Sequence, residues 1–538
     1  MNRIAIFLGA VGWLSCVACG GTQFYVSPSG DDSHDGHSQD TAWRTAAKVN
    51  GTKFAPGDSI LFQRGGEWHE QLIASSDGDD QNPITYADYG DAKAAKPTFW
   101  GSDVVAPSAI TSTGSSVYTF QASVLPTGHA YYVFADHKFL AFATDAGNMP
   151  ADSFIVVGGT VTMKTSGADP RTGSPVITVT DRAQGTDADS SLICSNGHND
   201  LVFRNLSGRE TAAAPQSGGL PDAYVYRIMG SRNIRMSDCD AVAGGKHHIG
   251  VINTTDFIGK NLHASGCIPG LGYGNAGAFV SFSDQSRSGD TSQWIDCTVD
   301  DFQPAEQSFI THGPGLGSLL IQNLTSLGCG LGIGMDNPNE KILIKGGLLT
   351  GPTCDIYGSH IVVDGLRITK DAKIDLFGNG NIVQNCIDAK STNPQGSIIV
   401  RGQGNIVRFN TLDHPAGAGP CINVQTAAAN TQIIGNLFTG GASPSVSDGG
   451  AAGLVLNYNG FDTSAGAPQG LDHDAHLATG DPHFTDISKG DYTLGSGSFA
   501  IGKVPASATD GPDHDALGNP RPAGGAYDIG ACQTQPQK

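Results

Sequence analysis

The sequence contains few strong helix-forming residues. Glutamate occurs only five times in 538 residues, whereas glycine occurs 74 times and Asp, Asn, Ser and Thr are abundant. This composition disfavours helices and favours short strands joined by tight turns. Hydrophobic residues make up 39% of the chain, which is enough to form a buried core and excludes a disordered tract.

Positive charge is also scarce. The chain has 31 Lys and Arg against 51 Asp and Glu, a formal net charge of −20. Nucleic acid needs cationic neutralisation by its partner, so we expect no nucleic acid to bind. The same charge weighs against a polyanionic substrate unless basic residues gather locally, and solubility alone accounts for it equally well.

No stretch near the start of the chain is apolar for long enough to span a bilayer. The apolar run of residues 4–14 follows a short basic start at Arg3, which is the pattern of an export signal. Residues 17–21, Val-Ala-Cys-Gly-Gly, resemble the lipobox of bacterial lipoproteins, in which the cysteine is lipidated after cleavage. Cys16 stands where that family usually has Leu.

This resemblance implies that residues 1–19 are a signal peptide and that Cys19 is the lipidation site. We expect an exported protein, either an outer-membrane lipoprotein or a periplasmic or extracellular one. Its only contact with a membrane would be the N-terminal lipid anchor. Cleavage by the ordinary signal peptidase and free secretion is the alternative.

Without Cys16 and Cys19, an odd number of cysteines remains, and these cannot all pair in an oxidising compartment. None of them forms a CxxC pair, which argues against structural zinc. Several recur near the ends of successive repeats, so we predict small apolar fillers of a core. The nine are Cys194, Cys239, Cys267, Cys297, Cys329, Cys354, Cys386, Cys421 and Cys532.

A strand-like pattern repeats ten times from about residue 194: an apolar triplet with two-residue alternation, beside a turn rich in Gly, Asn and Asp. Most intervals are near two dozen residues, too short for a strand–helix unit and suited to a coil of two or three strands. We therefore predict an all-β fold, a right-handed parallel β-helix with Asn at its bends. The first apolar residues are Leu201, Ile234, Phe257, Trp294, Leu319, Ile342, Ile361, Ile382, Ile406 and Ile433.

Both ends of the chain depart from this pattern, as the ends of a solenoid must. Residues 24–72 resemble the N-terminal segment of bacterial right-handed β-helix proteins of the pectate-lyase-like superfamily. Residues 481–532 resemble the choice-of-anchor Q module of secreted bacterial β-helix proteins, with a departure at residues 498–502. The segment before the repeats is similar to the small β insert of many β-helix glycosidases and lyases.

The acidic residues near the N-terminus bear on cofactors. We expect no certain cofactor, although Asp31, Asp32 and Asp35 keep a Ca²⁺ site open beside a capping role for the same residues. The expected parts are a signal peptide (1–19), a cap with the first turns (22–117), a small β insert (118–190), the main β-helix (191–445) and a C-terminal segment (446–538).

The densest ionisable cluster is Lys246-His247-His248. Alternate residues of a strand point to opposite faces, so Lys246 and His248 should share one face. Uronate lyases need a base for the C5 proton and cations for the charge that develops, which such a pair supplies. A plain polar sheet face accounts for these histidines as well.

A glycosidase instead needs two carboxyl groups about 5 to 9 Å apart, and carboxylates from successive turns meet that need. Combining both chemistries, we predict catalytic roles for Lys246, His248, His312, Glu306, Asp284 and Asp336. Loops inserted into the longer turns add substrate contacts, predicted for Tyr273 and Arg287, and the turns themselves add the predicted contacts of His247 and Arg227.

Three functions remain open from the sequence. A lyase or epimerase acting on a uronate-containing polysaccharide comes first, from the Lys-His-His cluster and the superfamily resemblance. A glycoside hydrolase comes second and is favoured by the net charge, and a non-catalytic glycan-binding or adhesion protein comes third. We expect the protein to be a monomer with a polysaccharide substrate.

Overall fold

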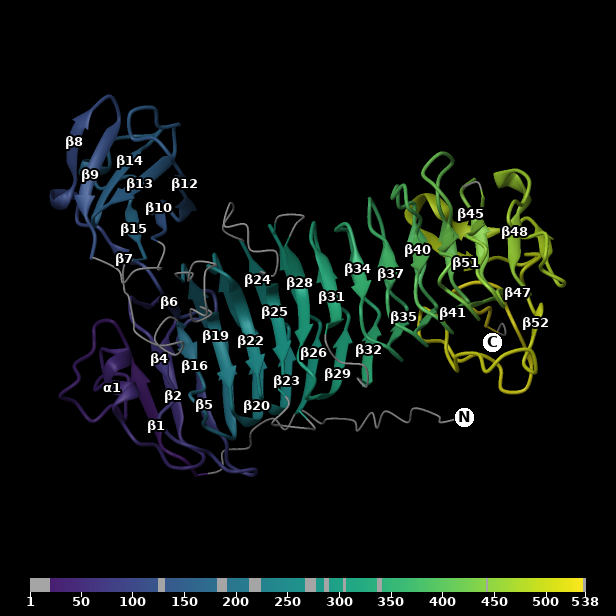
Figure 1. Cartoon of the computed structure of the whole chain (residues 1–538). Coiled ribbons are helices and arrows are strands. Elements are labelled where there is room, and N and C mark those ends of the chain that lie inside the picture. The colour runs from purple at the N-terminus through teal and green to yellow at the C-terminus, as the bar shows by residue number, and fades with distance from the viewer. Residues whose placement is uncertain are drawn as a thin grey trace.

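A computed structural model shows three long parallel sheets wound into a rod (Figure 1), which confirms the predicted parallel β-helix. The sheets have 12, 14 and 14 strands, and we call them sheet 1, sheet 2 and sheet 3. Within the described ranges, no helix is both long enough and apolar enough to cross a membrane. The structure describes residues 20–123, 131–180, 191–211, 224–266, 277–284, 290–302, 306–335, 341–441 and 444–535.

Each full turn of the coil contributes one strand to each sheet, in the order sheet 1, sheet 2, sheet 3. Sheet 1 contains β4 (Leu72–Ile73), β16 (Ile193–Cys194), β19 (Tyr224–Met229), β22 (His247–Ile252), β25 (Gly277–Phe282), β28 (Gln307–His312), β31 (Gly330–Met335), β34 (Cys354–Ile356), β37 (Ile374–Leu376), β40 (Ile398–Val400), β43 (Ile422–Val424) and β46 (Val446–Asp448).

Sheets 2 and 3 follow the same order of turns. Sheet 2 contains β1 (Gln23–Val26), β2 (Ser59–Gln63), β5 (Ile84–Tyr89), β17 (Leu201–Arg204), β20 (Arg232–Ser237), β23 (Thr255–Lys260), β26 (Asp290–Ile295), β29 (Leu316–Gln322), β32 (Lys341–Lys345), β35 (Val362–Asp364), β38 (Ile382–Gln384), β41 (Ile406–Arg408), β44 (Gln432–Ile434) and β47 (Val455–Asn457). Sheet 3 contains β3 (Glu67–Trp68), β6 (Thr98–Trp100), β18 (Ser207–Arg209), β21 (Asp240–Val242), β24 (His263–Ser265), β27 (Thr298–Asp300), β30 (Thr325–Ser326), β33 (Leu348–Leu349), β36 (Arg367–Ile368), β39 (Ile387–Ala389), β42 (Thr411–Asp413), β45 (Leu437–Thr439), β48 (Gly460–Asp462) and β49 (Ala478–Gly480).

The ten apolar triplets all lie in sheet 2, one turn above another. Leu201, Ile234 and Phe257 pair in register and are fully buried. Trp294 does not continue this column, because Ser292 pairs with Phe257 and Trp294 pairs with Gly259. The predicted stacking is therefore right for the strands, and the predicted residue is two positions out at this turn.

The predicted column also shifts by one residue near the C-terminal half. Ile382 pairs with Val362 and lies on the partly exposed side of its strand, whereas Asn381 is fully buried below Ile361 and accepts its backbone N–H at 2.8 Å. A one-residue shift exchanges the two faces of a strand. The inward position at this bend is polar, so an apolar pattern alone marks the wrong residue.

Buried asparagines do occupy the bends, as predicted. Asn410, Asn436 and Asn459 form a ladder between sheets 2 and 3 and are fully buried. The Asn436 Oδ1 accepts the backbone N–H of Asn410 at 3.1 Å, and its Nδ2 donates to the Val407 carbonyl at 2.9 Å. Each side-chain amide thus satisfies backbone groups of the turn before it, which makes burial of this polar group tolerable.

The eight described cysteines are buried and form no disulfide, which confirms their role as fillers of the core. Cys239 and Cys297 occupy equivalent positions, immediately before strands β21 and β27 of sheet 3. Their thiols donate to the Ser237 and Ile295 carbonyls. Burial raises the pKa of each of these two thiols to about 12. Cys267 lies outside the described residues.

The N-terminal acidic residues accept hydrogen bonds from their own loop. Asp32 accepts the backbone N–H groups of Arg44 and Thr45 at 2.8 and 3.0 Å, just before α1 (Ala46–Asn50). Asp31 and Asp35 each accept a backbone N–H two residues further on. These contacts fit the capping role. Among the described residues, no group of three or more His, Cys, Asp or Glu side chains is arranged to hold a metal ion.

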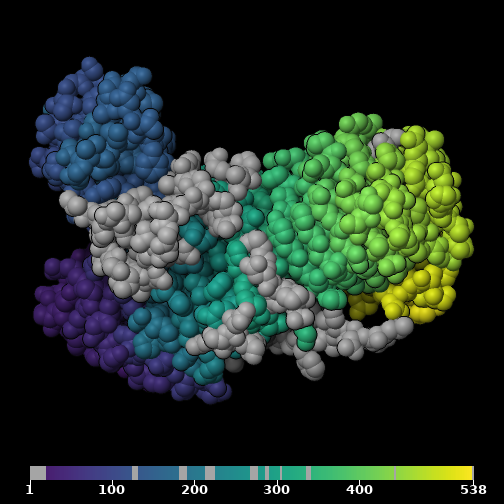
Figure 2. Space-filling model, in the orientation of Figure 1, coloured from purple at the N-terminus to yellow at the C-terminus, as the bar shows by residue number. Residues whose placement is uncertain are grey.

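A small β insert stands out from the N-terminal end of the rod (Figures 1 and 2). It comprises a four-stranded and a five-stranded sheet, runs from β7 (Asp103–Val104) to β15 (Ile177–Val179) and has its own apolar core. It therefore starts earlier than residue 118. The buried Glu210, which follows β18, accepts hydrogen bonds from Ser102 and Thr178 and contacts His137 of the insert at 2.9 Å.

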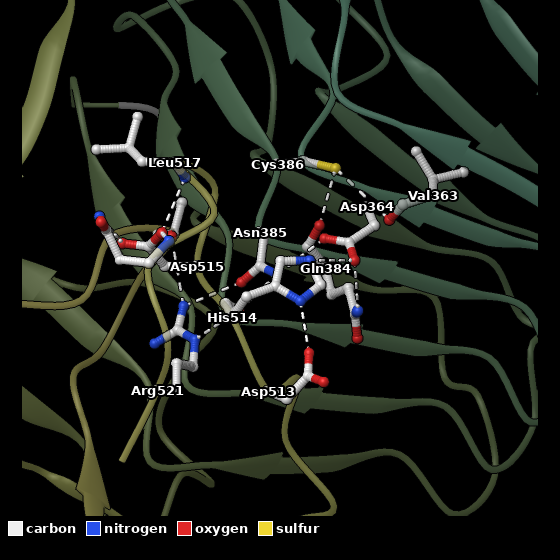
Figure 3. A network of polar contacts seen from close by, with 12 residues as sticks. Val363, Asp364, Gln384, Asn385, Cys386, Asp513, His514, Asp515, Leu517 and Arg521 are labelled. Atoms are coloured by element: carbon white, nitrogen blue, oxygen red, sulfur yellow. Dashed lines mark hydrogen bonds and ion pairs between the residues drawn. The ribbon is translucent and has the colours of Figure 1, made fainter. Parts of the chain in front are cut away.

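The C-terminal segment folds back against the outside of the rod where sheets 2 and 3 meet (Figure 3). The His514 Nε2 lies 3.0 Å from the Asp364 Oδ2, and the Arg521 Nη2 donates to the Asn385 Oδ1 at 3.0 Å. The hydrogen bond to Asp364 raises the pKa of His514 to about 9. This segment thereby covers polar groups of two neighbouring turns.

Candidate active site

The outer face of sheet 1 is the part of the rod beside which the chain carries its insertions. The insert enters between β6 of sheet 3 and β16 of sheet 1, and longer connections join β18 to β19 and β24 to β25. Segments inserted at the rim of a rigid stack are where binding and catalysis usually occur. The outer face of sheet 1 is therefore where the predicted site residues should meet.

The structure separates the members of the Lys-His-His cluster. Lys246 lies half-buried just before β22, and the His247 ring stacks on Tyr224 with centroids 5.2 Å apart. The His247 Nδ1 accepts the backbone N–H of Gly277 at 3.1 Å.

His248 is buried and does not share an exposed face with Lys246, contrary to our expectation. It is 1% exposed, and its ring packs against Phe302 at 4.8 Å. The Nε2 accepts the backbone N–H of Gly244 at 3.2 Å. Burial lowers the pKa of His248 to about 4. Two-residue alternation predicts the wrong face here, because the His248 side chain, at the start of β22, points into the corner between sheets 1 and 3.

Asp284 and Glu306, two of the three candidate carboxylates, are also separated. Asp284 follows β25 and exchanges two hydrogen bonds with Asn253, at 2.9 and 3.0 Å. Glu306 precedes β28 and therefore lies at the opposite end of the strands of sheet 1. A six-residue strand spans about 20 Å. These two carboxyl groups therefore cannot flank one glycosidic bond. Arg227 and His312 lie in β19 and β28, half-buried and three turns apart.

Four predicted residues lie outside the described residues: Asp336, Tyr273, Arg287 and the predicted lipidation site Cys19. Their predicted roles stay predictions.

A different cluster gathers further along the same sheet. Three consecutive strands, β34, β37 and β40, place two carboxylates, two cations and two aromatic rings side by side. Asp355 pairs directly with Asp375, so their Cα atoms lie about 4.8 Å apart. We call this the carboxylate–aromatic cluster; it comprises Asp355, Tyr357, Lys373, Asp375, Phe377 and Arg401.

Local sequence alternation explains why these side chains point outward. In β34, Cys354 and Ile356 are fully buried in the core, and in β37 Ile374 and Leu376 are. The residues between and after them must then face away from the core.

Asp375 is the ion-paired member of the carboxylate pair. Its side chain is 1% exposed and receives two hydrogen bonds from Arg401, at 2.6 and 2.9 Å, and one from Lys373 at 3.1 Å. A two-point contact with a guanidinium is among the strongest polar contacts in proteins. Asp375 thus holds both cations in place.

Asp355 lies in a different environment, which raises its pKa. Burial raises its pKa, and the charge of Asp375 adds to the increase, while hydrogen bonds from Thr353 and Tyr357 and the charge of Lys373 oppose it. The Tyr357 hydroxyl donates to the Asp355 Oδ2 at 3.3 Å. Two neighbouring carboxyl groups with different environments are the usual basis of an acid and an ionised partner in one site.

Planar side chains form a second row beside the carboxyl groups. The Tyr357 and Phe377 rings stack with centroids 4.9 Å apart and an interplanar angle of 18°. The Arg401 guanidinium lies over Phe377 at 4.9 Å. Tyr357 and Phe377 are 39% and 40% exposed, unusual values for large aromatic side chains. The cluster therefore offers apolar, planar surface next to an acid, a combination suited to a sugar.

The sequence does contain a signal for this cluster. The segments Cys-Asp-Ile-Tyr-Gly (354–358) and Ile-Asp-Leu-Phe-Gly (374–378) repeat at one turn's spacing. The triplets of sheet 2 and the longer insertions are more prominent patterns, and neither of them brings the strands of sheet 1 into alignment. Once those strands are aligned, Asp lies over Asp and an aromatic residue over an aromatic residue.

Comparison with known proteins gives a fold and a short sequence match. No family model matches the chain. The structure of XylC with xylose superposes with a TM-score of 0.59 at 13% identity, covering 96% of this chain and 98% of that one. A rhamnogalacturonan lyase, with a TM-score of 0.39 at 12% identity, covers 94% of this chain and 96% of its own. At 13% identity the likeness to XylC shows the fold alone.

One curated relative matches in sequence. A lacto-N-biosidase of Bifidobacterium longum subsp. longum is 40% identical over 82 residues, which is 14% of this chain. This chain spans only 5% of the length of that relative.

Proposed function

We propose that the chain is a glycoside hydrolase that acts on a neutral glycan at the carboxylate–aromatic cluster. The observation that carries this proposal is the pairing of Asp355 with Asp375 on neighbouring strands, one with a raised pKa and one ion-paired. The sequence match to a lacto-N-biosidase supports a carbohydrate-active enzyme. Its activity is not transferred to this chain, because the match covers a small part of both.

In this proposal Asp355 is the general acid. Its protonated carboxyl group donates a proton to the glycosidic oxygen as the bond to the anomeric carbon breaks. The ion-paired Asp375, one strand away, opposes the positive charge that develops on the sugar ring. Water adds to the anomeric carbon, and the proton that it releases restores Asp355.

The charges of the cluster favour a neutral substrate over a uronate. Both cations are ion-paired with Asp375, so neither is placed to balance a carboxylate of the substrate. The lyase hypothesis rested on the superfamily resemblance and on Lys246 and His248 sharing one face, and His248 is buried. Export and the lipid anchor stay predictions from residues 1–19.

Product analysis tests this function. The full chain is incubated with neutral, N-acetylated and uronic oligosaccharides, while reducing ends and near-ultraviolet absorbance are measured. We expect new reducing ends from a neutral or N-acetylated glycan without absorbance. Asp355→Asn should lower kcat/KM by about 100-fold or more. The control is Asp448→Asn, the same substitution in β46, the last strand of sheet 1.

Two outcomes would contradict the proposal. Unsaturated products absorbing in the near ultraviolet would establish a lyase. Full activity of the Asp355→Asn variant would place catalysis elsewhere on the molecule.

A further inference from the structure

A glycine interrupts the row of outward side chains directly beside Asp355. Gly332 of β31 pairs with Asp355 on one side and with Ile310 of β28 on the other. Its neighbours in the strand, Leu331 and Ile333, are buried in the core. The outer face therefore lacks a side chain at the position next to the proposed acid.

The Gln307 carboxamide lies across this glycine. A methyl group at Gly332 would meet the Gln307 Oε1 at 2.5 Å and its Nε2 at 2.8 Å. Only glycine at residue 332 leaves room for the amide in this place. The side chain reaches diagonally from β28, since the backbone of Gln307 pairs with Gly330.

The oxygen of this amide is buried and has no hydrogen-bond partner among the described residues. Leaving such an acceptor unsatisfied costs folding free energy, so a native protein that keeps one usually has a use for it. Gln425, on the outer face beyond the cluster, is different, because its amide donates to the Asn423 Oδ1 at 2.8 Å.

We propose that Gln307, held over Gly332, is a positioning residue that accepts a hydroxyl of a neutral sugar and places that sugar against Asp355. The proposal rests on the proposed function and narrows its substrate. A carbonyl oxygen accepts a hydroxyl proton and repels a carboxylate, so the sugar bound here is uncharged at this position. Gln307 takes no part in the bond-breaking step.

Deoxy substrates test this role. Aryl glycosides of the sugar that the enzyme cleaves are prepared with one hydroxyl at a time replaced by hydrogen, and kcat/KM is measured. A site built to bind a hydroxyl strongly rejects the analogue without it. We expect one deoxy analogue to lose about 100-fold with the wild-type chain, mainly through KM, and Gln307→Ala to abolish that discrimination.

A double-mutant cycle separates positioning from folding. Gly332→Ala displaces the amide and should reproduce the effect of Gln307→Ala, and the double variant should be no worse than either single one. Gln425→Ala is the matched control and should discriminate like the wild type. Thermal melting of every variant is recorded, so that a loss of discrimination at unchanged Tm excludes misfolding.

The inference fails if Gln307→Ala discriminates between parent and deoxy substrates as the wild type does. The proposed function survives that result if Asp355→Asn is still inactive. If the chain hydrolyses no glycoside in the panel, the proposed function fails, and the role of Gln307 fails with it.

Discussion

At the scale of single residues, Asp355 carries a cost that a purely structural residue would not keep. Its pKa is raised in the folded chain, so the ionised form is less stable there than in the unfolded chain. The folded state therefore loses stability as pH rises above the ordinary value of 3.8. Strain of this kind is common at sites kept for function.

Asp355→Asn should consequently melt at a higher temperature than the wild type at neutral pH while losing activity. The gain in Tm should shrink as pH falls below 3.8, where the wild-type carboxyl becomes protonated in both states. Thermal melting across this range measures the effect, with Asp448→Asn as the control. A lower Tm at neutral pH would mean that Asp355 is a structural ligand of its neighbours.

Lys373 gives a second test at this scale. Its positive charge holds the pKa of Asp355 lower than it would otherwise be. If protonated Asp355 is the general acid, kcat/KM falls as pH rises through this pKa. Lys373→Met should raise the pKa and move that alkaline limb to higher pH, whereas Lys345→Met, in sheet 2, should leave the limb in place. A limb that moves to lower pH would contradict the assignment.

At the scale of strands and turns, the buried asparagine ladder is as important as the apolar columns. Asn436 satisfies Asn410 on one side and the Val407 carbonyl on the other. Asn436→Ala should therefore lower the free energy of unfolding by about 2 to 4 kcal/mol, since two buried groups lose their partner. Asn379→Ala, at an exposed turn, should cost much less; equal losses in urea unfolding would contradict the ladder's role.

The strands also show how far sequence could predict this molecule. Two-residue alternation and a two-dozen-residue interval were enough to predict a parallel β-helix, because every turn must bury the same face. The exact residues of the column were not predictable where Asn381 replaces an apolar residue. A single shift in register exchanges the faces of a strand, and alternation cannot report it.

The candidate site was harder to predict, for two physical reasons. His248 sits where the strand meets a corner, and there alternation no longer tells which side chain is exposed. Asp355 and Asp375 look like ordinary turn-region residues in isolation, and only the register of sheet 1 brings them together. A dense local cluster such as Lys246-His247-His248 is visible in the sequence, whereas a pair one turn apart becomes visible only in the fold.

At the scale of the whole molecule, the C-terminal segment stabilises the rod through His514. Its folded pKa of about 9 exceeds the ordinary 6.5. The contact with Asp364 thus contributes fully below about pH 6.5, and its contribution is lost as pH rises through about 9. His514→Gln should remove this part of the pH dependence of urea unfolding. An unchanged pH dependence would show that the segment is held by other contacts.

The central claim is that sugar binds on the outer face of sheet 1 at the carboxylate–aromatic cluster. A crystal structure of the Asp355→Asn variant with an oligosaccharide that the wild-type chain cleaves tests it most directly. We predict a sugar ring in contact with Tyr357 and Gln307, its glycosidic oxygen within hydrogen-bond distance of residue 355. A sugar bound beside Lys246 and His312 instead, or on another sheet, would contradict this claim.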